Sequence, residues 1–265
     1  MIWVNGEPQA QIATGDRGLQ FGDGCFTTAR IRSGQVDHLE AHVARLQQAC
    51  DRLMIAGLEV VALTQQMREA AQRQRDGVLK VIVTRGSGGR GYSAAGCRQP
   101  TTILSLSPAP LHYAAWQTRG VTLATSPVRL SRNSLLAGIK HLNRLEQVMI
   151  RAHLDGGDAD EALVLDTDGW LVECCAANLF WRKGKQVYTP DLSLAGVTGL
   201  MREHILTLLP ELGWQASSVL APPEALAAAD EVFICNALMP VLSVTRINQW
   251  HYASRELADQ LRPHC

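Results

Sequence analysis

Hydrophobic and polar residues alternate along residues 25–31, which predicts a β-strand. Phe26, Thr28 and Arg30 fall on one face of this strand, and the smaller or apolar residues between them fall on the other. An aromatic ring, a hydroxyl and a guanidinium together are unusual for a protein core. This face is suited to the wall of a pocket, and a solvated strand face explains the pattern equally well.

Apolar residues recur at helical spacing in the two segments that follow, residues 39–53 and 61–75, which predicts two helices. Arg45 lies beside the apolar stripe of the first helix. An arginine in such a place normally runs its stem along the surface and keeps its charge in water. A strongly apolar strand is predicted next, at Val78–Thr84.

The second half of the chain mixes strands and helices in the same way. Strands are predicted at residues 102–106, 121–125 and 232–237, and as a tight hairpin around the turn Asp168-Gly169. Helices are predicted up to about Leu154, with Leu142, Leu145, Met149 and Ala152 on one face, from Gly199 onward, and weakly within residues 246–265.

A proline-spaced segment, Ser107-Pro108-Ala109-Pro110, interrupts this series of elements. Such a break is typical of a domain boundary. At 265 residues the chain has room for one large or two ordinary domains. We therefore predict a small N-terminal domain over residues 1–107, a linker over 108–116, and a larger C-terminal domain over 117–265.

The charge balance limits the kinds of partner. Lys and Arg together number 25, as do Asp and Glu, so the formal net charge is zero. A neutral chain gives no electrostatic reason to expect nucleic acid or an anionic membrane as a partner, and a small molecule is expected instead. The N-terminus shows no secretory pattern, and no stretch approaches the roughly 18 apolar residues of a membrane span. We expect a soluble, cytoplasmic protein.

The spacing of the cysteines and histidines indicates whether disulfides and metal sites are to be expected. The seven cysteines are odd in number and form no CxxC pair, which favours reduced thiols in a cytoplasm over a disulfide framework. The eight histidines show no HxH or HExxH spacing, so we expect no metal site.

Glu173 is the first candidate for chemistry, because it follows the apolar residues of the predicted hairpin and no Lys or Arg lies within eight residues of it. A buried carboxylate without a cationic partner costs several kcal/mol, on the order expected for buried charges. The partner must come from elsewhere in the fold or from a bound molecule, such as the protonated pyridine nitrogen of pyridoxal phosphate. Taken alone, a glutamate that caps the next segment or faces solvent is the more ordinary interpretation.

Lys140 is the second candidate, since it stands at a loop-to-helix junction beside Ile139. Apolar neighbours and a helix N-terminus disfavour the charged form of a lysine, which makes the amine a nucleophile able to form a Schiff base. An isolated lysine in this position is more often a solvated charge.

Three segments have the features of anion sites. Residues 85–93 hold four glycines and two arginines, Arg85 and Arg90, which suits a carboxylate, although a flexible surface hairpin is the competing interpretation. The segment 196–199 has a glycine at each end and precedes a predicted helix. It is a candidate phosphate site, because the free amides and the dipole of a helix N-terminus favour an anion. The pair Asn236-Ala237 ends an apolar strand and offers further hydrogen bonds.

Together these motifs resemble the fold-type IV pyridoxal-phosphate enzymes, a family that includes branched-chain and D-amino-acid aminotransferases and aminodeoxychorismate lyases. The resemblance covers nearly the whole chain and rests on the motifs Phe21-Gly22-Asp23-Gly24, His42-Val43-Ala44-Arg45-Leu46, Ile139-Lys140-His141-Leu142-Asn143, Glu173 with Asn178-Leu179-Phe180, and Gly196-Val197-Thr198-Gly199. It implies a mixed α+β or α/β fold of two α/β domains with the cofactor site between them. It also implies a homodimer.

The resemblance implies a role for each candidate residue. Lys140 becomes the Schiff-base lysine and Glu173 the partner of the pyridine nitrogen. The phosphate ligands become Arg45, the amides of Val197 and Thr198, and the pair Asn236 and Ala237. The substrate would contact Phe26, Arg30, Arg85 and Arg90.

Within the family, the motifs around Thr28, Arg85 and Lys140 are most similar to those of the lyases. Aminotransferases often carry glutamate where this chain has Thr27, and a residue without a hydroxyl where it has Thr28. The implied activity is that of a carbon–oxygen lyase of folate biosynthesis, which converts 4-amino-4-deoxychorismate to 4-aminobenzoate and pyruvate. In it Lys140 is also the general base, and Thr28 protonates the leaving group. A branched-chain or D-amino-acid aminotransferase is the alternative, and a non-catalytic pyridoxal-phosphate carrier is a more distant one.

Overall fold

The computed structural model describes residues 1–265 and divides into two compact units. Unit 1 comprises Met1–Ala109 and the short segment Ile139–Asn143. Unit 2 comprises Pro110–Gly138 and Arg144–Cys265. None of the helices combines the length and the apolar character that crossing a membrane requires.

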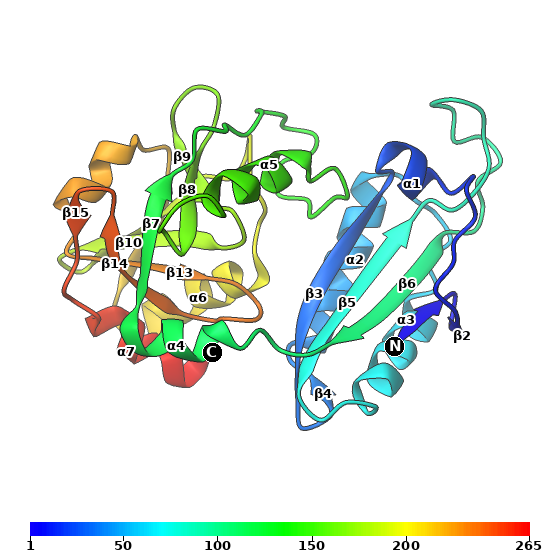
Figure 1. The fold of residues 1–265 in the computed structure, drawn as a ribbon, viewed down its shortest axis with the longest axis horizontal. Helices are drawn as coiled ribbons and strands as arrows, with labels where there is room; N and C mark the ends of the chain where they lie inside the picture. The colour runs from blue at the N-terminus through cyan, green and yellow to red at the C-terminus, as the bar shows by residue number, and fades with distance from the viewer. The chain divides into compact units, whose positions relative to one another are not determined.

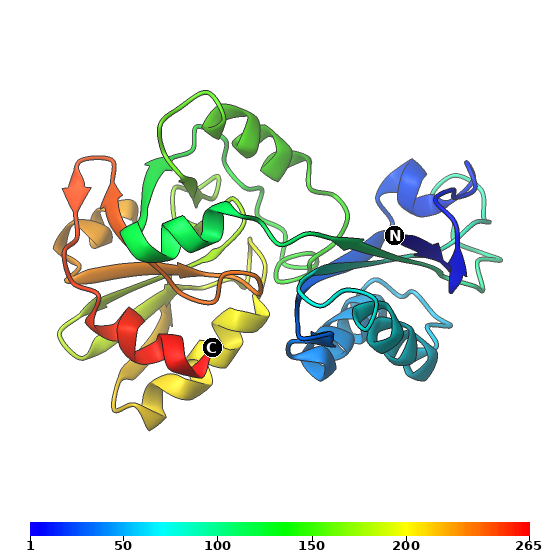
Figure 2. The same cartoon turned by 60° about the horizontal axis from the view of Figure 1, so that its bottom comes forward.

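Unit 1 is built on a six-stranded antiparallel sheet with the strand order β2-β1-β6-β5-β3-β4 (Figure 1). Its elements are β1 (Ile2–Val4), β2 (Glu7–Pro8), α1 (Arg17–Phe21), β3 (Gly24–Arg32), β4 (Gln35–Val36), α2 (Leu39–Arg52), α3 (Val60–Ala71), β5 (Gly77–Thr84) and β6 (Thr101–Ser107). The helices α2 and α3 cover one face of this sheet (Figure 2).

The core of unit 1 lies between that face and the two helices. Ile31 of β3, Leu79 of β5 and Leu104 of β6 pack there against Leu46 of α2 and Met67 of α3, and all five are almost fully buried. Each such side chain contributes about 1.5–3 kcal/mol through removal of its apolar surface from water. The opposite face of the sheet carries a different set of residues, which belong to the candidate site.

Unit 2 is built on a nine-stranded mixed sheet with the order β12-β11-β10-β13-β14-β7-β8-β9, and β15 pairs with β14 (Figure 1). Its strands are β7 (Val121–Thr125), β8 (Glu161–Leu165), β9 (Leu171–Cys174), β10 (Asn178–Lys183), β11 (Gln186–Pro190), β12 (Gln215–Val219), β13 (Glu231–Cys235), β14 (Leu242–Ile247) and β15 (Trp250–His251). Its helices are α4 (His112–Arg119), α5 (Leu145–Leu154), α6 (Leu200–Glu211) and α7 (Glu256–Leu261), with 3₁₀ turns at Pro223–Ala228 and Arg262–His264.

Two parallel crossovers shape unit 2. The helix α5 connects β7 to its parallel neighbour β8, and α6 connects β11 to its parallel neighbour β12. The helices α6 and α7 lie on one face of the sheet, where Ile205 and Leu257 pack against Phe180 and Phe233 (Figure 2). The stacked rings of Phe180 and Phe233 are 4.9 Å apart between centroids.

The sequence patterns located many of these elements. The strand at residues 25–31, the helix at 39–53 and the strand at Val78–Thr84 are confirmed as β3, α2 and β5. The hairpin around Asp168-Gly169 is confirmed by the antiparallel pairing of β8 and β9. Its turn forms because the side chain of Asp166 accepts hydrogen bonds from the amides of Asp168 and Trp170.

Other expectations differ from the structure. The helix up to Leu154 begins only at Leu145, and it buries Ile150 and Leu154. Leu145 and Met149, two of the residues predicted to share one face of this helix, are 72% and 50% exposed. The residues predicted as a linker, 108–116, include the start of α4, whose first residue is His112.

The segment that carries Lys140 also differs from its predicted place. The predicted domains put it in the C-terminal part of the chain, whereas its contacts group it with unit 1. The reason is backbone pairing, because the amide of Phe26 donates to the carbonyl of Lys140 at 2.9 Å and the amide of Leu142 donates to that of Gly24 at 3.0 Å.

Candidate functional site

The strand β3 presents two faces of opposite character, as the alternation predicts. Thr27 and the other residues on its helix side are buried, while Phe26, Thr28 and Arg30 are half-buried on the other face. The register with β5 places Lys80 directly opposite Thr28, and therefore on that same face. This face, defined by Phe26, Thr28, Arg30 and Lys80, is called the open face below.

Lys140 joins the open face through its side chain. Its Nζ lies 4.7 Å from the centroid of the Phe26 ring, and the Nζ of Lys80 lies 5.2 Å from the same centroid. Ammonium groups over an aromatic ring are held by the negative charge of the ring face. Two such groups beside one ring give the open face a concentrated positive charge, which suits an anionic ligand.

Lys80 was missed by the sequence analysis, although a signal was present. It is the single charged residue in the otherwise apolar strand β5. In a strand with one packed face, a lone charge marks the side that is not packed. Pairing that side with Thr28 needs the register, which the sequence alone does not supply.

The buried side of β3 contains a polar pair. Thr27 Oγ1 and His42 Nδ1 are joined by a hydrogen bond of 2.6 Å, and both residues are almost fully buried. Burial lowers the pKa of His42 to about 3, and the positive charges of Arg45 and His38 act in the same direction. Arg45, the predicted phosphate ligand, is half-buried on α2 close enough for its charge to act on His42.

In unit 2, Glu173 lies at the buried end of β9 and is 5% exposed. Its Oε2 accepts a hydrogen bond of 2.8 Å from the amide of Val197. The chain passes close to this carboxylate at Gly196, whose φ is +87°, and a Cβ there would lie 2.6 Å from Val172 Cγ1 and 3.2 Å from Glu173 Oε2. Glycine is therefore required at position 196.

A cation near Glu173 also escaped the sequence analysis. Burial lowers the pKa of Arg144, and the negative charge of Glu173 acts in the opposite direction. Glu173 thus has a positively charged neighbour, Arg144, from another part of the sequence. The sequence predicted that the partner of Glu173 comes either from elsewhere in the fold or from a bound molecule, and Arg144 is of the first kind.

The amides predicted to bind phosphate donate to protein oxygens in this structure. The amide of Val197 donates to Glu173, and the amide of Thr198 donates to the carbonyl of Gly138 at 3.1 Å. The side chain of Asn236 is likewise engaged, because its Oδ1 accepts from the amides of two residues that follow and its Nδ2 donates to the carbonyl of Ala176 at 2.9 Å. The amide of Asn236 donates to Met239, and Ala237 follows it at the end of the strand. The phosphate roles of these residues stay predictions.

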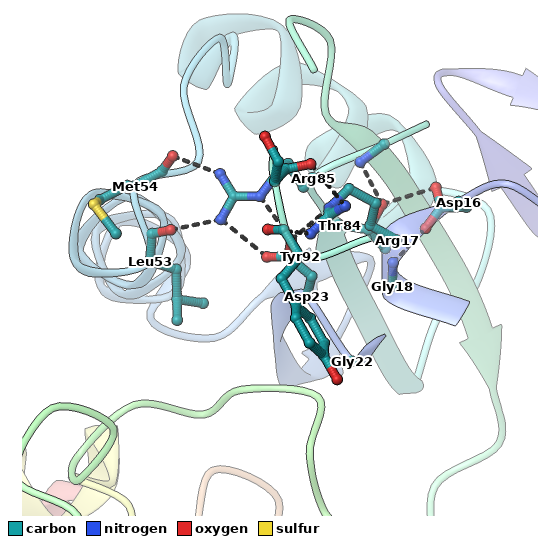
Figure 3. A network of polar contacts seen from close by, with 12 residues as sticks. Asp16, Arg17, Gly18, Gly22, Asp23, Leu53, Met54, Thr84, Arg85 and Tyr92 are labelled. Carbon is teal, nitrogen blue, oxygen red and sulfur yellow. Dashed lines mark hydrogen bonds and ion pairs between the residues drawn. The ribbon is translucent and has the colours of Figure 1, made fainter. Parts of the chain in front are cut away.

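The predicted carboxylate-binding arginines occupy different settings. Arg30 is on the open face, and Arg90 is exposed on the loop that follows β5. Arg85 is held by the protein itself, through two hydrogen bonds to Asp23 of 2.7 and 3.0 Å and one each to the carbonyls of Leu53 and Met54 (Figure 3). These bonds use four of its five N–H groups, so Arg85 has a structural role and only one N–H group is left for the predicted substrate contact.

Asp23 also accepts a hydrogen bond of 2.9 Å from Arg17, which is buried (Figure 3). Burial alone would raise the pKa of Asp23, but the hydrogen bonds from Arg85 and Arg17 outweigh it, and the pKa is lowered. The carboxylate is therefore charged at neutral pH and joins two guanidinium groups. Arg17 had no place among the sequence candidates, because nothing near it in the sequence marks its partners.

The structure thus brings together Phe26, Thr28, Arg30 and Lys140 on one face of unit 1, and adds Lys80 to them. In unit 2 it brings together Glu173, Val197 and the charge of Arg144. An amine, a hydroxyl and cations are the groups needed for proton transfer on an anionic substrate. No group of three or more His, Cys, Asp or Glu side chains is placed to hold a metal ion.

Comparison with known proteins gives a consistent result. Residues 24–247 match the family model described as "Amino-transferase class IV". An aminodeoxychorismate lyase of Vibrio harveyi is 40% identical over 248 residues, which cover 94% of this chain and 92% of that protein. A D-alanine aminotransferase of Bacillus licheniformis is 30% identical over 88% of this chain and 82% of that protein. The crystal structure of a 4-amino-4-deoxychorismate lyase from Pseudomonas aeruginosa superposes with a TM-score of 0.94 at 39% identity, over 99% of this chain and 98% of that one.

Proposed function

Because this chain belongs to the class IV aminotransferase family, we propose that it is a pyridoxal-phosphate-dependent lyase that converts 4-amino-4-deoxychorismate to 4-aminobenzoate and pyruvate, a step toward folate. The observation that carries the proposal is the open face, where the Thr28 hydroxyl lies on the same face as the amine of Lys140. A lyase needs an acid for its leaving group as well as a base, and these two side chains supply both.

The side chains present fit the cofactor. Pyridoxal phosphate needs an amine for its aldehyde, an acid for its ring nitrogen, and cations or amides for its phosphate. Lys140 supplies the amine, Glu173 supplies the acidic side chain and Arg45 supplies a cation. The other proposed phosphate ligands are those that the resemblance implies: Val197, Thr198, Asn236 and Ala237. When bound, the cofactor serves as a sink for the electrons released at the carbon that bears the substrate amine.

The chain's own residues then act in order. Lys140 removes the proton from that carbon as the general base. The bond between the neighbouring ring carbon and the enolpyruvyl oxygen breaks, and Thr28 gives that oxygen a proton. The ring becomes aromatic, which makes the step downhill. Arg30 and Lys80, two cations of the open face, bind the carboxylates of the substrate, together with Arg90 from the loop that follows β5.

The protein is also proposed to be a cytoplasmic homodimer. All seven cysteines are free, as expected of a reducing compartment. The outer face of α5 exposes Leu145, Val148 and Met149, the last two by 61% and 50%. An exposed apolar helix face is typical of a protein–protein contact, and a second copy of the chain fits it. Light scattering of the purified protein checks this proposal, and a monomeric mass would contradict it.

The test of the activity is direct. The purified protein, loaded with pyridoxal phosphate, is mixed with enzymatically made aminodeoxychorismate, and 4-aminobenzoate fluorescence and pyruvate are followed together. Equal amounts of both products support the lyase. An aminotransferase would instead transfer the amino group to the cofactor and release a keto acid, and a carrier would leave the substrate unchanged. Either result would overturn the proposal.

A further inference from the structure

Arg17 begins α1 and is buried, although no part of the proposed reaction uses it. The helix is fixed in place at this residue. Asp16, the N-cap, accepts hydrogen bonds from the amide of Gly18 at 2.8 Å and from the hydroxyl of Thr84 at 2.9 Å, and the amide of Arg17 donates to the carbonyl of Gly86 at 3.0 Å. The backbone of Arg17 is therefore attached to the end of β5 and to the loop that follows it.

The guanidinium of Arg17 reaches further along that loop (Figure 3). Its Nη1 donates to the carbonyls of Gly91 at 2.8 Å and Ser93 at 3.3 Å, and its Nη2 donates to that of Tyr92 at 3.2 Å. These carbonyls belong to a tight turn, called here the Arg90–Ser93 turn, in which the amide of each end residue donates to the carbonyl of the other at 3.2 and 3.1 Å. One buried guanidinium thus holds three successive carbonyls.

The Arg90–Ser93 turn is itself exposed, and the Tyr92 side chain is 91% exposed. The Tyr92 ring lies 5.6 Å from the Phe21 ring, and the Arg17 guanidinium lies 4.8 Å from that same ring. A solvent-exposed turn with so little apolar packing depends strongly on its polar anchor. Arg17 supplies that anchor from the buried side.

Asp23 connects this anchor to the catalytic strand. It binds the Nε of Arg17 at 2.9 Å and stands directly before Gly24, the first residue of β3. The same carboxylate binds Arg85, whose remaining N–H groups hold the end of α2. Asp23 therefore links the Arg90–Ser93 turn, through Arg17, to the strand that carries Thr28.

We infer that Arg17 and Asp23 are positioning residues, which hold the Arg90–Ser93 turn at a fixed place relative to β3 so that Arg90 can bind a carboxylate of the substrate. This inference rests on the proposed function. Neither residue touches the reacting atoms. Their loss acts on substrate affinity through the turn and leaves the chemistry of Lys140 and Thr28 in place.

The first experiment replaces Arg17 by alanine in the cofactor-loaded enzyme. KM for aminodeoxychorismate is expected to rise about tenfold or more, while kcat stays within about threefold. This is the pattern expected when a mutation removes an interaction that is equally strong in the bound substrate and in the transition state. Cofactor absorbance is expected to be unchanged. Millimolar guanidinium chloride is expected to restore a low KM, because it can refill the site of the lost side chain. Arg17→Lys, which keeps the charge but loses the planar fork, replaces this variant if Arg17→Ala does not fold.

Arg85→Met is the matched control, since Arg85 shares Asp23 but holds the end of α2 and makes no contact with the turn. It is expected to lower the thermal midpoint and leave KM for the substrate unchanged. Trypsin gives a second readout, because cleavage after Arg90 is expected to accelerate in the Arg17 variant and not in the Arg85 variant.

Two outcomes would overturn the inference: a normal KM in the Arg17 variant of an active enzyme, or an equal rise of KM in both variants. Failure of the proposed function is a separate result, seen when the unaltered protein makes no 4-aminobenzoate. The positioning role is then judged by trypsin alone, and unchanged cleavage after Arg90 would reject it.

Discussion

Thr27 and Thr28 are neighbours of identical chemistry on β3, yet the two faces of the strand give them different surroundings. Thr27 is buried against α2 and hydrogen-bonded to His42 at 2.6 Å. Thr28 is half-buried, opposite Lys80 and on the same face as the amine of Lys140. Residue type alone therefore says little about function here, and the face on which a residue lies says much more.

The two faces of β3 differ in packing and in hydrogen bonding. On the helix side, the Thr27 hydroxyl has a protein partner in His42 and the apolar side chains are packed, so a substitution there mainly changes stability. On the open face, the cations and the Thr28 hydroxyl are not covered by packed helices of unit 1. A substitution there should therefore change substrate affinity or turnover. Substitutions on the two faces test this division.

The largest effect is expected at Lys140, the amine of the open face. Lys140→Ala should abolish both cofactor absorbance and turnover, because it removes the amine proposed to bind the aldehyde and take the proton. Absorbance and product formation are the measurements. Lys80→Ala is the matched control, since its Nζ contacts the same Phe26 ring, and it should keep cofactor absorbance. Activity of Lys140→Ala without added amine would refute the assignment.

Thr28→Ala is expected to show the next largest effect. Turnover should fall about 100-fold or more, the range of lost general-acid catalysis, while the cofactor stays bound. Unfolding in urea should be nearly unchanged, because the hydroxyl lies outside the packed core. Thr28→Ser keeps the hydroxyl and should keep most of the activity. An unchanged rate for Thr28→Ala would remove its role as an acid.

His42, on the helix side, should appear as a pH dependence of stability. Burial depresses its pKa to about 3, so the folded protein keeps the ring neutral while the unfolded chain takes up a proton below about 6.5. The free energy of unfolding should therefore fall as pH drops from about 6.5 toward 3, by about 2 kcal/mol at pH 5 from this group alone. Urea titrations at pH 7 and pH 5 measure it. His42→Gln should remove that part of the slope, and an identical slope would contradict the prediction.

Thr27→Val is expected to have the smallest effect and the opposite signature to Thr28→Ala. It leaves His42 Nδ1 buried without the Thr27 hydroxyl, which costs about 1–2 kcal/mol of unfolding free energy. Turnover should stay within about twofold of the unaltered enzyme. A large loss of rate with full stability would show that the two faces are not separate in function.

Local patterns predicted the parts of the molecule that local physics governs. Alternation assigned the two faces of β3, and helical spacing located α2, because side-chain direction in both elements follows from backbone geometry. The residues of the open face that lie on β3 could therefore be found from sequence. The family resemblance then gave Lys140 and Glu173 their roles.

Contacts between distant residues could not be predicted in this way. Arg17 is 74 residues from Gly91, and Arg85 is 62 residues from Asp23, so no spacing rule links them. Arg85 and Arg90 looked equivalent in the glycine-rich loop, and the fold distinguishes them because Arg85 is bound by the half-buried carboxylate of Asp23 while Arg90 is exposed. The apolar face of α5 follows the helical pattern, yet part of it is exposed, because a pattern shows that a face is apolar without showing what covers it.

The return of residues 139–143 to unit 1 has a consequence for how the protein is made. The strand β3 emerges from the ribosome more than a hundred residues before the segment that pairs with Gly24 and Phe26. The N-terminal part of the chain can form its sheet early, but it lacks Lys140 until the later segment has been translated. A fragment ending at Ala109 would therefore be an incomplete unit, and co-expression of two halves cut at that point would have to reassemble this pairing to restore activity.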